Sequence, residues 1–517
     1  MSKEVVYLTT PLYYVNAKPH IGHAYTNVIA DAFSRFYRLT GKEVFFLTGT
    51  DEHGTKIERI AKEQKMEPRV FVDQMVPEFQ RLWKQLDIRY DDFIRTVEDR
   101  HKKVVAQVLD RLEKEGKIYK ATYEGWYCTP CESFWTELQL VEGKCPDCRR
   151  DVQRLQEENY FFKLSEYQDW LIDYIHKHPD FIFPQMRKNE ILGFLREKLE
   201  DLCITRPKSR LQWGIDYPNS PDHVVYVWFD ALINYVTAPG YLADPKRFSR
   251  LWPASVHFVG KDILRQHAVY WPIMLKAMGL ELPEHIVAHG WWTMGGTKVS
   301  KSRGNAVDAF ELTDKYGIDA FRYYLLREVT LGYDGAFSEE LFKERYEKDL
   351  ANDLGNLWSR NVAMLEKYFG GKVPEMDSAE LSKEKLYQDA LAAMKQIMDL
   401  MNVYDPREAL NIIFRLVTQA NQYVDEKKPW SLAKDAARAG ELKIFMVCMM
   451  EVLGHLGILL LPFLPKTAAE MLSRCGLNIV SWNLEQYTKR LFASQHTIQK
   501  GEVLFPKLLD EKPAGDA

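Results

Sequence analysis

The chain has 517 residues, of which 46% are hydrophobic and 27% are charged, and its formal net charge is −4. This length exceeds what one hydrophobic core supports and predicts roughly three or four domains. The composition is typical of a folded protein and excludes a disordered or fibrous one. Because the net charge is slightly negative, a nucleic-acid partner would have to be bound by local basic patches.

Two segments bear on a membrane location. The start, MSKEVVYLTT, has an acidic residue where a signal peptide would be apolar. The longest apolar run, IFMVCMMEVLGHLGILLLPFLP, is interrupted by Glu451, His455 and Pro462. Since a membrane span needs about 20 mostly uninterrupted apolar residues, we expect a buried core helix, no membrane partner and a cytoplasmic protein.

The first elements alternate between strand and helix patterns. The run VVYLTT predicts a strand, HIGHAYTNVIADAFSRFYRLTG predicts a helix that ends at Gly41, and EVFFLTGTDEHG predicts a second strand with a polar loop after it. This order indicates a βαβ unit and a Rossmann-like parallel α/β sheet. Ligands of such sheets lie beyond the carboxyl ends of the strands.

The start of that first helix is a candidate phosphate site. In KPHIGHAYT, His20 and His23 are spaced i and i+3 on one face of the first turn, with Gly22 between them. A helix N-terminus attracts anions, and two imidazoles add donors for phosphate oxygens. The alternative is a pair of surface or capping histidines; we favour phosphate binding.

Four of the seven cysteines lie in CTPCESFWTELQLVEGKCPDC, as the pairs Cys128/Cys131 and Cys145/Cys148. Two C-x-x-C turns supply the four thiolates of a tetrahedral zinc site. Two disulfides are the alternative, which a reducing compartment disfavours. All four coordination positions are filled, so we expect one structural Zn²⁺ per chain. The remaining cysteines, Cys203, Cys448 and Cys475, are expected to be buried packing residues.

The strand–helix alternation resumes in HVVYVWFDALINY, VHFVGKDI and HIVAHGWW, and the chain after about Glu340 has helical periodicity. The sequence therefore predicts a sheet split by a zinc-bearing insertion and followed by an all-α helix bundle. The expected bounds are 1–117 and 223–295 for the halves of the catalytic domain, 118–222 for the insertion, 296–348 for a signature-loop region and 349–517 for the bundle.

The stretch TKVSKSRGN is a cationic loop in which Lys298 and Lys301 are preceded by Gly295 and Gly296 and followed by Gly304. It is open to three interpretations: solvated surface, a phosphorylation site or a mobile clamp for phosphates. We favour the clamp, because the loop follows the last strands of the same sheet. Lys298 and Lys301 would then neutralise a triphosphate, and the glycines would let the loop close.

HIGH followed downstream by KVSKS resembles the two signatures of class I aminoacyl-tRNA synthetases, HIGH and KMSKS, with Val299 in place of methionine. The segments TTPLYYVNAKPHIGHAYT, FLTGTDEHG, VYVWFDALINY, FVGKDILRQHAVYWP and DEKKPW resemble the methionine-specific family, from Val6 to about Pro506. Asp216 departs from the proline expected after WGI. The chain resembles a short form without an extra C-terminal tRNA-binding domain, so we expect a monomer that needs no stable protein partner.

The resemblance implies a ligase that activates L-methionine with ATP and Mg²⁺ and transfers it to tRNA(Met). Asp51 matches the position that binds the α-ammonium group, and Lys261 and Asp262 match nucleotide-contacting positions, as do the two signatures. Arg206 is a further active-site candidate. The side-chain pocket matches Leu12, Tyr14, Trp228, Leu232, Tyr235, Ile263 and His267. Such a pocket suits a thioether but discriminates one methylene by only about 1–3 kcal/mol, so homocysteine should compete.

In the helical region, Asn356, Arg360 and Trp430 match the family's positions for reading the CAU anticodon. Single-stranded bases are recognised by stacking and by hydrogen bonds to their edges. The alternative is a core tryptophan beside a solvated Asn–Arg face.

Two other functions stay open at this point. An isoleucyl-, valyl- or leucyl-type synthetase would carry a large editing insertion, and a cysteinyl-type enzyme would place its zinc at the amino-acid site. The second alternative function is a catalytically inactive, zinc-bearing RNA-binding protein. The intact histidines of HIGH and lysines of KVSKS argue against it.

Overall fold

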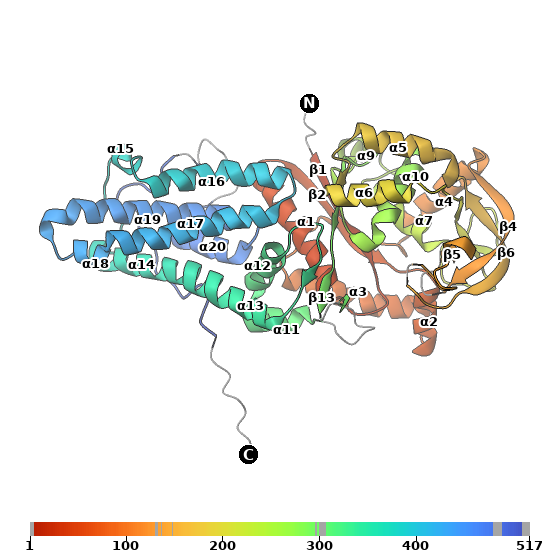
Figure 1. Cartoon of the computed structure of the whole chain (residues 1–517), viewed down its shortest axis with the longest axis horizontal. Helices are drawn as coiled ribbons and strands as arrows, with labels where there is room; N and C mark the ends of the chain where they lie inside the picture. Colours follow the sequence, from red (N-terminus) through yellow and green to blue (C-terminus); the bar gives the residue numbers. More distant parts are fainter. Residues whose placement is uncertain are drawn as a thin grey trace, which may run out of the picture. The chain divides into compact units, whose positions relative to one another are not determined.

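Figure 1 shows a computed structural model of the chain, which describes residues 5–129, 133–135, 137–146, 148–294, 297–298, 307–478, 487 and 489–508. Its described residues divide into two compact units. Unit 1 comprises Met1–Ala30, Val44–Lys84 and Ile88–Gly290, and unit 2 comprises Asp31–Glu43, Gln85–Asp87 and Trp291–Ala517.

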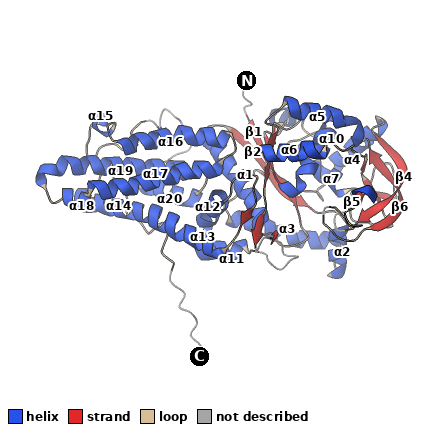
Figure 2. Ribbon diagram, viewed as in Figure 1, coloured by secondary structure: helices blue, strands red, loops and turns tan. Residues whose placement is uncertain are grey.

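A parallel sheet forms the centre of unit 1 (Figure 2). Among the described residues its order is β3-β2-β1-β11-β12-β7, with β3 Asp92–Arg95, β2 Glu43–Asp51, β1 Val5–Tyr14, β11 Val256–Gly260, β12 His285–His289 and β7 Ile182–Phe183. The pairs β2/β3, β1/β11, β11/β12 and β12/β7 are parallel. Helix α1 (Ile21–Leu39) connects β1 to β2, so the predicted βαβ unit is confirmed.

These strands are continuous apolar runs because helices cover the sheet. Every residue of β11 is buried, as are the first seven of β1. The remaining helical segments of this part of unit 1 are α2 Thr55–Glu63, α3 Pro68–Gln85, α4 Asp99–Lys114, α7 Val227–Leu232, α8 Asn234–Thr237, α9 Pro245–Leu251, η3 Lys261–Ile263, η4 Gln266–Tyr270 and α10 Trp271–Ala277.

The inserted segment carries an antiparallel sheet, in the order β5-β4-β6-β8 for the part of the chain that is described. Its strands are β5 Ser133–Trp135, β4 Ile118–Cys128, β6 Gln153–Phe162 and β8 Leu202–Cys203, beside the pair β9 Thr205–Pro207 and β10 His223–Val225. Its helical segments are η1 Glu137–Gln139, η2 Leu164–Tyr167, α5 Gln168–Lys177 and α6 Gln185–Phe194. The predicted split of the sheet is confirmed. The inserted segment is not self-contained, however, because its strand β7 pairs with β12 of the parallel sheet.

Unit 2 is mostly helical, as expected, and also holds a small sheet of β14 Thr297–Lys298, β13 Trp292–Met294 and β15 Gly335–Ala336. Its helical segments are α11 Ala309–Tyr316, α12 Ile318–Glu328, α13 Glu339–Arg345, η6 Tyr346–Gly355, α14 Asn356–Phe369, α15 Ser378–Leu381, α16 Lys385–Asn402, α17 Pro406–Lys427, α18 Pro429–Leu432, η7 Ala436–Arg438, α19 Ala439–Leu460 and α20 Pro465–Arg474. Helices α16, α17 and α19 pack together (Figure 1).

Helix α19 contains most of the longest apolar run, up to Leu460. Among the described residues, the stretch Ala436–Leu460 is the one helix whose length and composition would suit a membrane span, and 89% of its apolar window is buried in the fold. Glu451 lies inside it with no exposure, where its carboxylate accepts main-chain N–H bonds from Leu491 and Phe492. The prediction of a buried core helix is therefore confirmed.

Candidate active site

The predicted site residues of unit 1 follow the carboxyl ends of neighbouring parallel strands. Leu12 and Tyr14 end β1, Asp51 ends β2, and Lys261 follows β11. His289 ends β12, where its Nε2 lies 2.7 Å from Thr26 Oγ1 in the first turns of α1. The sheet order therefore brings these side chains to one edge, where ligands of open parallel sheets bind.

His20 and His23 cap α1 reciprocally. His20 Nδ1 accepts a hydrogen bond from the Gly22 main-chain N–H at 3.0 Å, and His23 Nδ1 accepts one from the His20 N–H at 3.3 Å. The two rings stack, with centroids 3.9 Å apart. A ring nitrogen that accepts carries no proton, so each neutral imidazole has its proton on Nε2. Capping of the helix and binding of phosphate are therefore compatible with each other, because capping uses only Nδ1 of each ring.

Gly22 is required by this arrangement. A Cβ at this position would lie 2.9 Å from Cε1 of His20, closer than packed carbon atoms approach. Any side chain here would push the His20 ring out of its stack on His23. Tyr13 and Phe79 pack against the other sides of His23, with ring centroids 5.1 and 5.6 Å away.

The wall of the candidate methionine pocket is a neutral hydrogen-bonded pair. His267 lies in η4, a π-helical turn, and its Nδ1 donates to the Ile263 carbonyl at 2.9 Å. Its Nε2 therefore accepts from the Tyr235 hydroxyl, 2.8 Å away. Burial lowers the pKa of His267 to about 4, so the ring is uncharged at neutral pH. The edge of Trp228 faces this ring at 6.5 Å between centroids.

The other pocket candidates lie near the end of β1, in α7 and in η3. Leu232, in α7, and Tyr235 are 2% and 1% exposed, whereas Leu12, Tyr14, Trp228 and Ile263 are half-buried. Gly49 of β2 leaves room first for the main-chain carbonyl of Ile94 and also for Leu12, whose Cδ2 would lie 2.9 Å from an added Cβ. A wall of aromatic and aliphatic groups, together with the Asp51 carboxylate at the end of β2, suits an amino acid with an apolar side chain and a free ammonium group.

The candidates for nucleotide contact are described only in part. Lys261 is half-buried and Asp262 is exposed, and the Asp262 carboxylate folds back over Gly260 at the end of β11. Of the cationic loop, Lys298 is described only as a residue of β14, while Lys301 and the three glycines lie outside the described residues.

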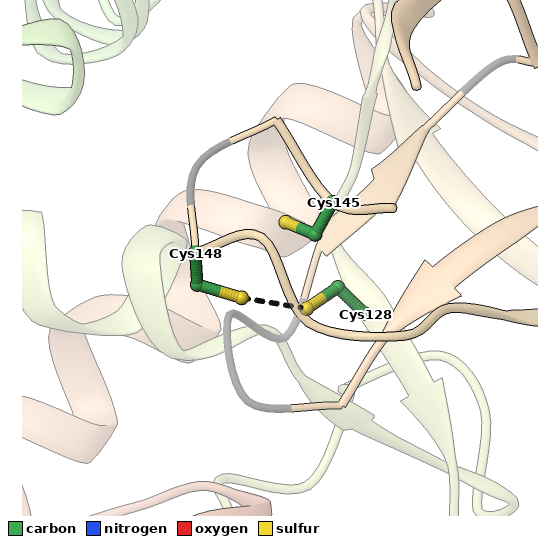
Figure 3. Close-up of side chains that lie close together, drawn as sticks. All are labelled: Cys128, Cys145 and Cys148. Atoms are coloured by element: carbon green, nitrogen blue, oxygen red, sulfur yellow. Dashed lines mark hydrogen bonds between the residues drawn. The ribbon is translucent and has the colours of Figure 1, made fainter. Parts of the chain in front are cut away.

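Three of the four predicted metal ligands lie together (Figure 3). The Sγ atoms of Cys128, Cys145 and Cys148 are within 4.8 Å of one another, and those of Cys128 and Cys148 are 3.4 Å apart. Zinc–sulfur bonds of about 2.3 Å place ligand sulfurs roughly 3.8 Å apart, so the donor set fits a metal ion. Cys131 lies outside the described residues. Cys203, Cys448 and Cys475 are buried elsewhere, as expected.

The three anticodon candidates lie in unit 2. Asn356 begins α14 and is exposed, and Arg360 lies one turn later, with Nη2 3.8 Å from Asp425 Oδ1 of α17. Trp430, in α18, is 41% exposed. The alternative of a core tryptophan is therefore wrong for Trp430, in contrast to Trp358, which is 1% exposed.

The cluster around Asp230 was not anticipated from the sequence, whereas Arg206 was a candidate residue of the active site. Asp230, fully buried in α7, accepts from His53 Nδ1 and from His101 Nε2, each at 2.7 Å. Arg206 is also buried, and its guanidinium lies 4.4 Å from the ring centroid of Tyr226, which precedes α7. Only the short spacings from His53 to Asp51 and from Asp230 to Trp228 could have signalled the cluster around Asp230.

A split parallel sheet with paired histidines at its first crossover helix, followed by a helical region, defines a class I aminoacyl-tRNA synthetase. The family model described as class I tRNA synthetases (M) matches residues 6–157 and 152–362, and that described as the anticodon binding domain of methionyl tRNA ligase matches residues 373–515. The chain belongs to the methionyl-tRNA synthetases, which ligate methionine to tRNA. The alternative synthetases and the inactive RNA-binding protein are therefore wrong.

Individual relatives agree with this assignment. The methionine–tRNA ligase of Caldanaerobacter subterraneus subsp. tengcongensis is 50% identical, with 99% of this chain and 80% of that protein covered. The enzyme of Clostridium perfringens is 47% identical, over 99% and 80%. The structure of Mycobacterium tuberculosis methionyl-tRNA synthetase in complex with methionyl-adenylate superimposes with a TM-score of 0.92 at 37% identity, covering 97% of this chain and all of that one (100%).

Proposed function

We propose that the strand-end site of unit 1 forms methionyl-adenylate with the residues assigned above. A methionine carboxylate oxygen attacks the α-phosphorus of ATP in line, the bond to the bridging oxygen breaks, and pyrophosphate leaves. The terminal ribose hydroxyl of tRNA then attacks the carbonyl of the mixed anhydride, and AMP leaves. No covalent enzyme nucleophile is needed, because positioning and charge stabilisation carry such chemistry.

The observation that carries the proposal is the reciprocal cap of His20 and His23. Since each Nδ1 accepts a main-chain N–H, the Nε2–H groups become the donors for ATP phosphate oxygens at a helix start that already favours anions. Lys261 and Asp262 contact the nucleotide in this proposal. Lys298 and Lys301 neutralise the leaving pyrophosphate together with the Mg²⁺ that accompanies ATP.

The amino-acid side of the site is built from charge and shape. Asp51 binds the α-ammonium group by a charge-assisted hydrogen bond. The thioether lies against the uncharged Tyr235–His267 pair and Trp228. Because this wall lacks a charge, it favours an apolar side chain, and homocysteine competes through its similar shape.

The zinc and anticodon assignments complete the proposal. Cys128, Cys131, Cys145 and Cys148 hold one Zn²⁺, which cross-links the two turns and has no open position for substrate. Asn356, Arg360 and Trp430 bind the CAU anticodon. We also propose a cytoplasmic monomer with the five domain ranges given above.

Pyrophosphate exchange into ATP, run with each amino acid separately, tests the proposal. Exchange should depend on methionine, with homocysteine as the strongest substitute. Exchange without any amino acid, or a preference for leucine or isoleucine over methionine, would contradict it.

A further inference from the structure

Asp230 joins three segments of unit 1. Its Oδ2 accepts from His53, in the loop after β2, and its Oδ1 accepts from His101 of α4. Asp230 and His101 have no exposed surface, and His53 is 4% exposed. Burial raises the pKa of Asp230, whereas His53 and His101 together lower it by more. The pKa of Asp230 therefore lies below its usual range. The carboxylate is therefore ionised and paired at both oxygens.

Two members of this cluster, His53 and Asp230, lie close in sequence to residues of the proposed methionine site. His53 follows Asp51 by two positions, and Asp230 follows Trp228 by two positions. Two helical residues apart corresponds to about 200° around the axis, so Asp230 and Trp228 lie on opposite sides of α7. A hydrogen bond that holds Asp230 inward therefore fixes the rotation of α7 and the direction of Trp228.

We propose that Asp230, with His53 and His101, is a positioning residue that fixes the spacing between the ammonium-binding carboxylate and the aromatic wall of the methionine pocket. This inference rests on the proposed function. Replacing a buried ion pair by apolar side chains is often neutral or stabilising, so stability is a weak reason for placing a carboxylate here. The directional hydrogen bonds instead set the geometry between β2 and α7.

The two histidines donate to Asp230 from different ring nitrogens, Nδ1 in His53 and Nε2 in His101. Substitution by asparagine and by glutamine should therefore have opposite effects at the two positions, which gives crossed pairs of variants. An asparagine amide reaches the position of Nδ1, and a glutamine amide reaches that of Nε2. His53→Asn and His101→Gln therefore retain the donor to Asp230, whereas His53→Gln and His101→Asn lose it. Asp230→Asn replaces an acceptor by a donor that faces a ring N–H.

The measurement is methionine-dependent pyrophosphate exchange, with separate KM values for methionine and ATP and the melting temperature of each variant. Asp230→Asn, His53→Gln and His101→Asn should raise KM for methionine about tenfold at unchanged KM for ATP. His53→Asn and His101→Gln should restore KM for methionine to within about threefold of the parent.

His223→Asn is the matched control, because His223 is a buried histidine whose ring nitrogens bond Ser220 and the Glu158 carbonyl instead of Asp230. It should change only the melting temperature. Equal rises in both KM values, or no difference between the crossed pairs, would overturn the inference. Failure of the parent protein to require methionine would instead contradict the proposed function.

Discussion

The imidazole rings of His20 and His23 stack at 3.9 Å, and each uses Nδ1 to accept a main-chain N–H at the start of α1. Structural capping and phosphate binding therefore use different nitrogens of the same rings. Substitutions that retain one and remove the other can separate the two roles.

His20→Asn should reduce exchange while preserving the helix. The asparagine oxygen replaces Nδ1 as the acceptor for Gly22 N–H, but nothing replaces the Nε2 donor. Loss of one preorganised donor to developing charge costs about 10²–10³-fold in rate. His20→Ala removes both, and should in addition lower the free energy of unfolding by about 1 kcal/mol. Exchange kinetics and urea unfolding of the two variants measure this, and unimpaired exchange by His20→Asn would refute the donor role.

Gly22→Ala should impair activity more than stability. Alanine favours a helix over glycine by up to about 1 kcal/mol, but its Cβ would displace the His20 ring. We expect exchange to fall by at least about tenfold, since small misplacements are costly in rate. Gly193→Ala is the control, because Gly193 lies in α6, is exposed and has no neighbour within 4 Å of an added Cβ. Equal activity of both variants would show that the ring position is unimportant.

His267 should make the protein less stable in acid. Its native pKa is about 4 because the ring is buried, whereas the unfolded value is about 6.5. As pH falls below 6.5, the unfolded chain binds a proton that the native ring excludes, so native stability declines towards pH 4. The loss at pH 5 should be about 2 kcal/mol relative to pH 7.5. Urea unfolding of the parent and of His267→Gln at both values tests this, and identical pH dependence would contradict it.

Metal analysis should find one zinc ion per chain. The substitution Cys145→Ser should reduce this zinc content. The expected consequence is a lower melting temperature, because metal binding to such turns contributes folding free energy. Cys475→Ser is the control, since Cys475 is equally buried but outside the cluster. A fully active, metal-free preparation, or unchanged zinc in Cys145→Ser, would be inconsistent with the four-cysteine site.

Trp430→Ala should impair tRNA charging while adenylate formation continues. Stacking on one base contributes about 1–3 kcal/mol, which corresponds to roughly a 5- to 150-fold lower kcat/KM for tRNA. Trp430 is 41% exposed, so its loss should change stability little. Tyr333→Ala removes another exposed aromatic residue of unit 2, 56% exposed, and should leave charging intact. Equal losses in exchange and charging would refute the anticodon assignment.

Local patterns predicted much of this fold. Strand runs, the helix after His20 and the C-x-x-C turns depend on neighbours in sequence. The described strands, α1 and the cysteines Cys128, Cys145 and Cys148 lie where these patterns indicated. The His53–Asp230–His101 cluster could not be found this way, because its members are separated by 129 residues or more from Asp230. The exposure of Trp430 was equally out of reach, since a tryptophan after a helix suits a core as well as a surface.

The pairing of β7 with β12 decides how the inserted segment can be altered. A deletion of residues 118–222 would remove β7 and leave β12 as an edge strand with unpaired main-chain groups and buried side chains such as Ile286 and Val287. Open apolar edges of this kind recruit other chains. The inserted segment therefore cannot be deleted without a replacement for β7. A truncated enzyme would need a substitute strand or a charged residue on β12 to avoid aggregation.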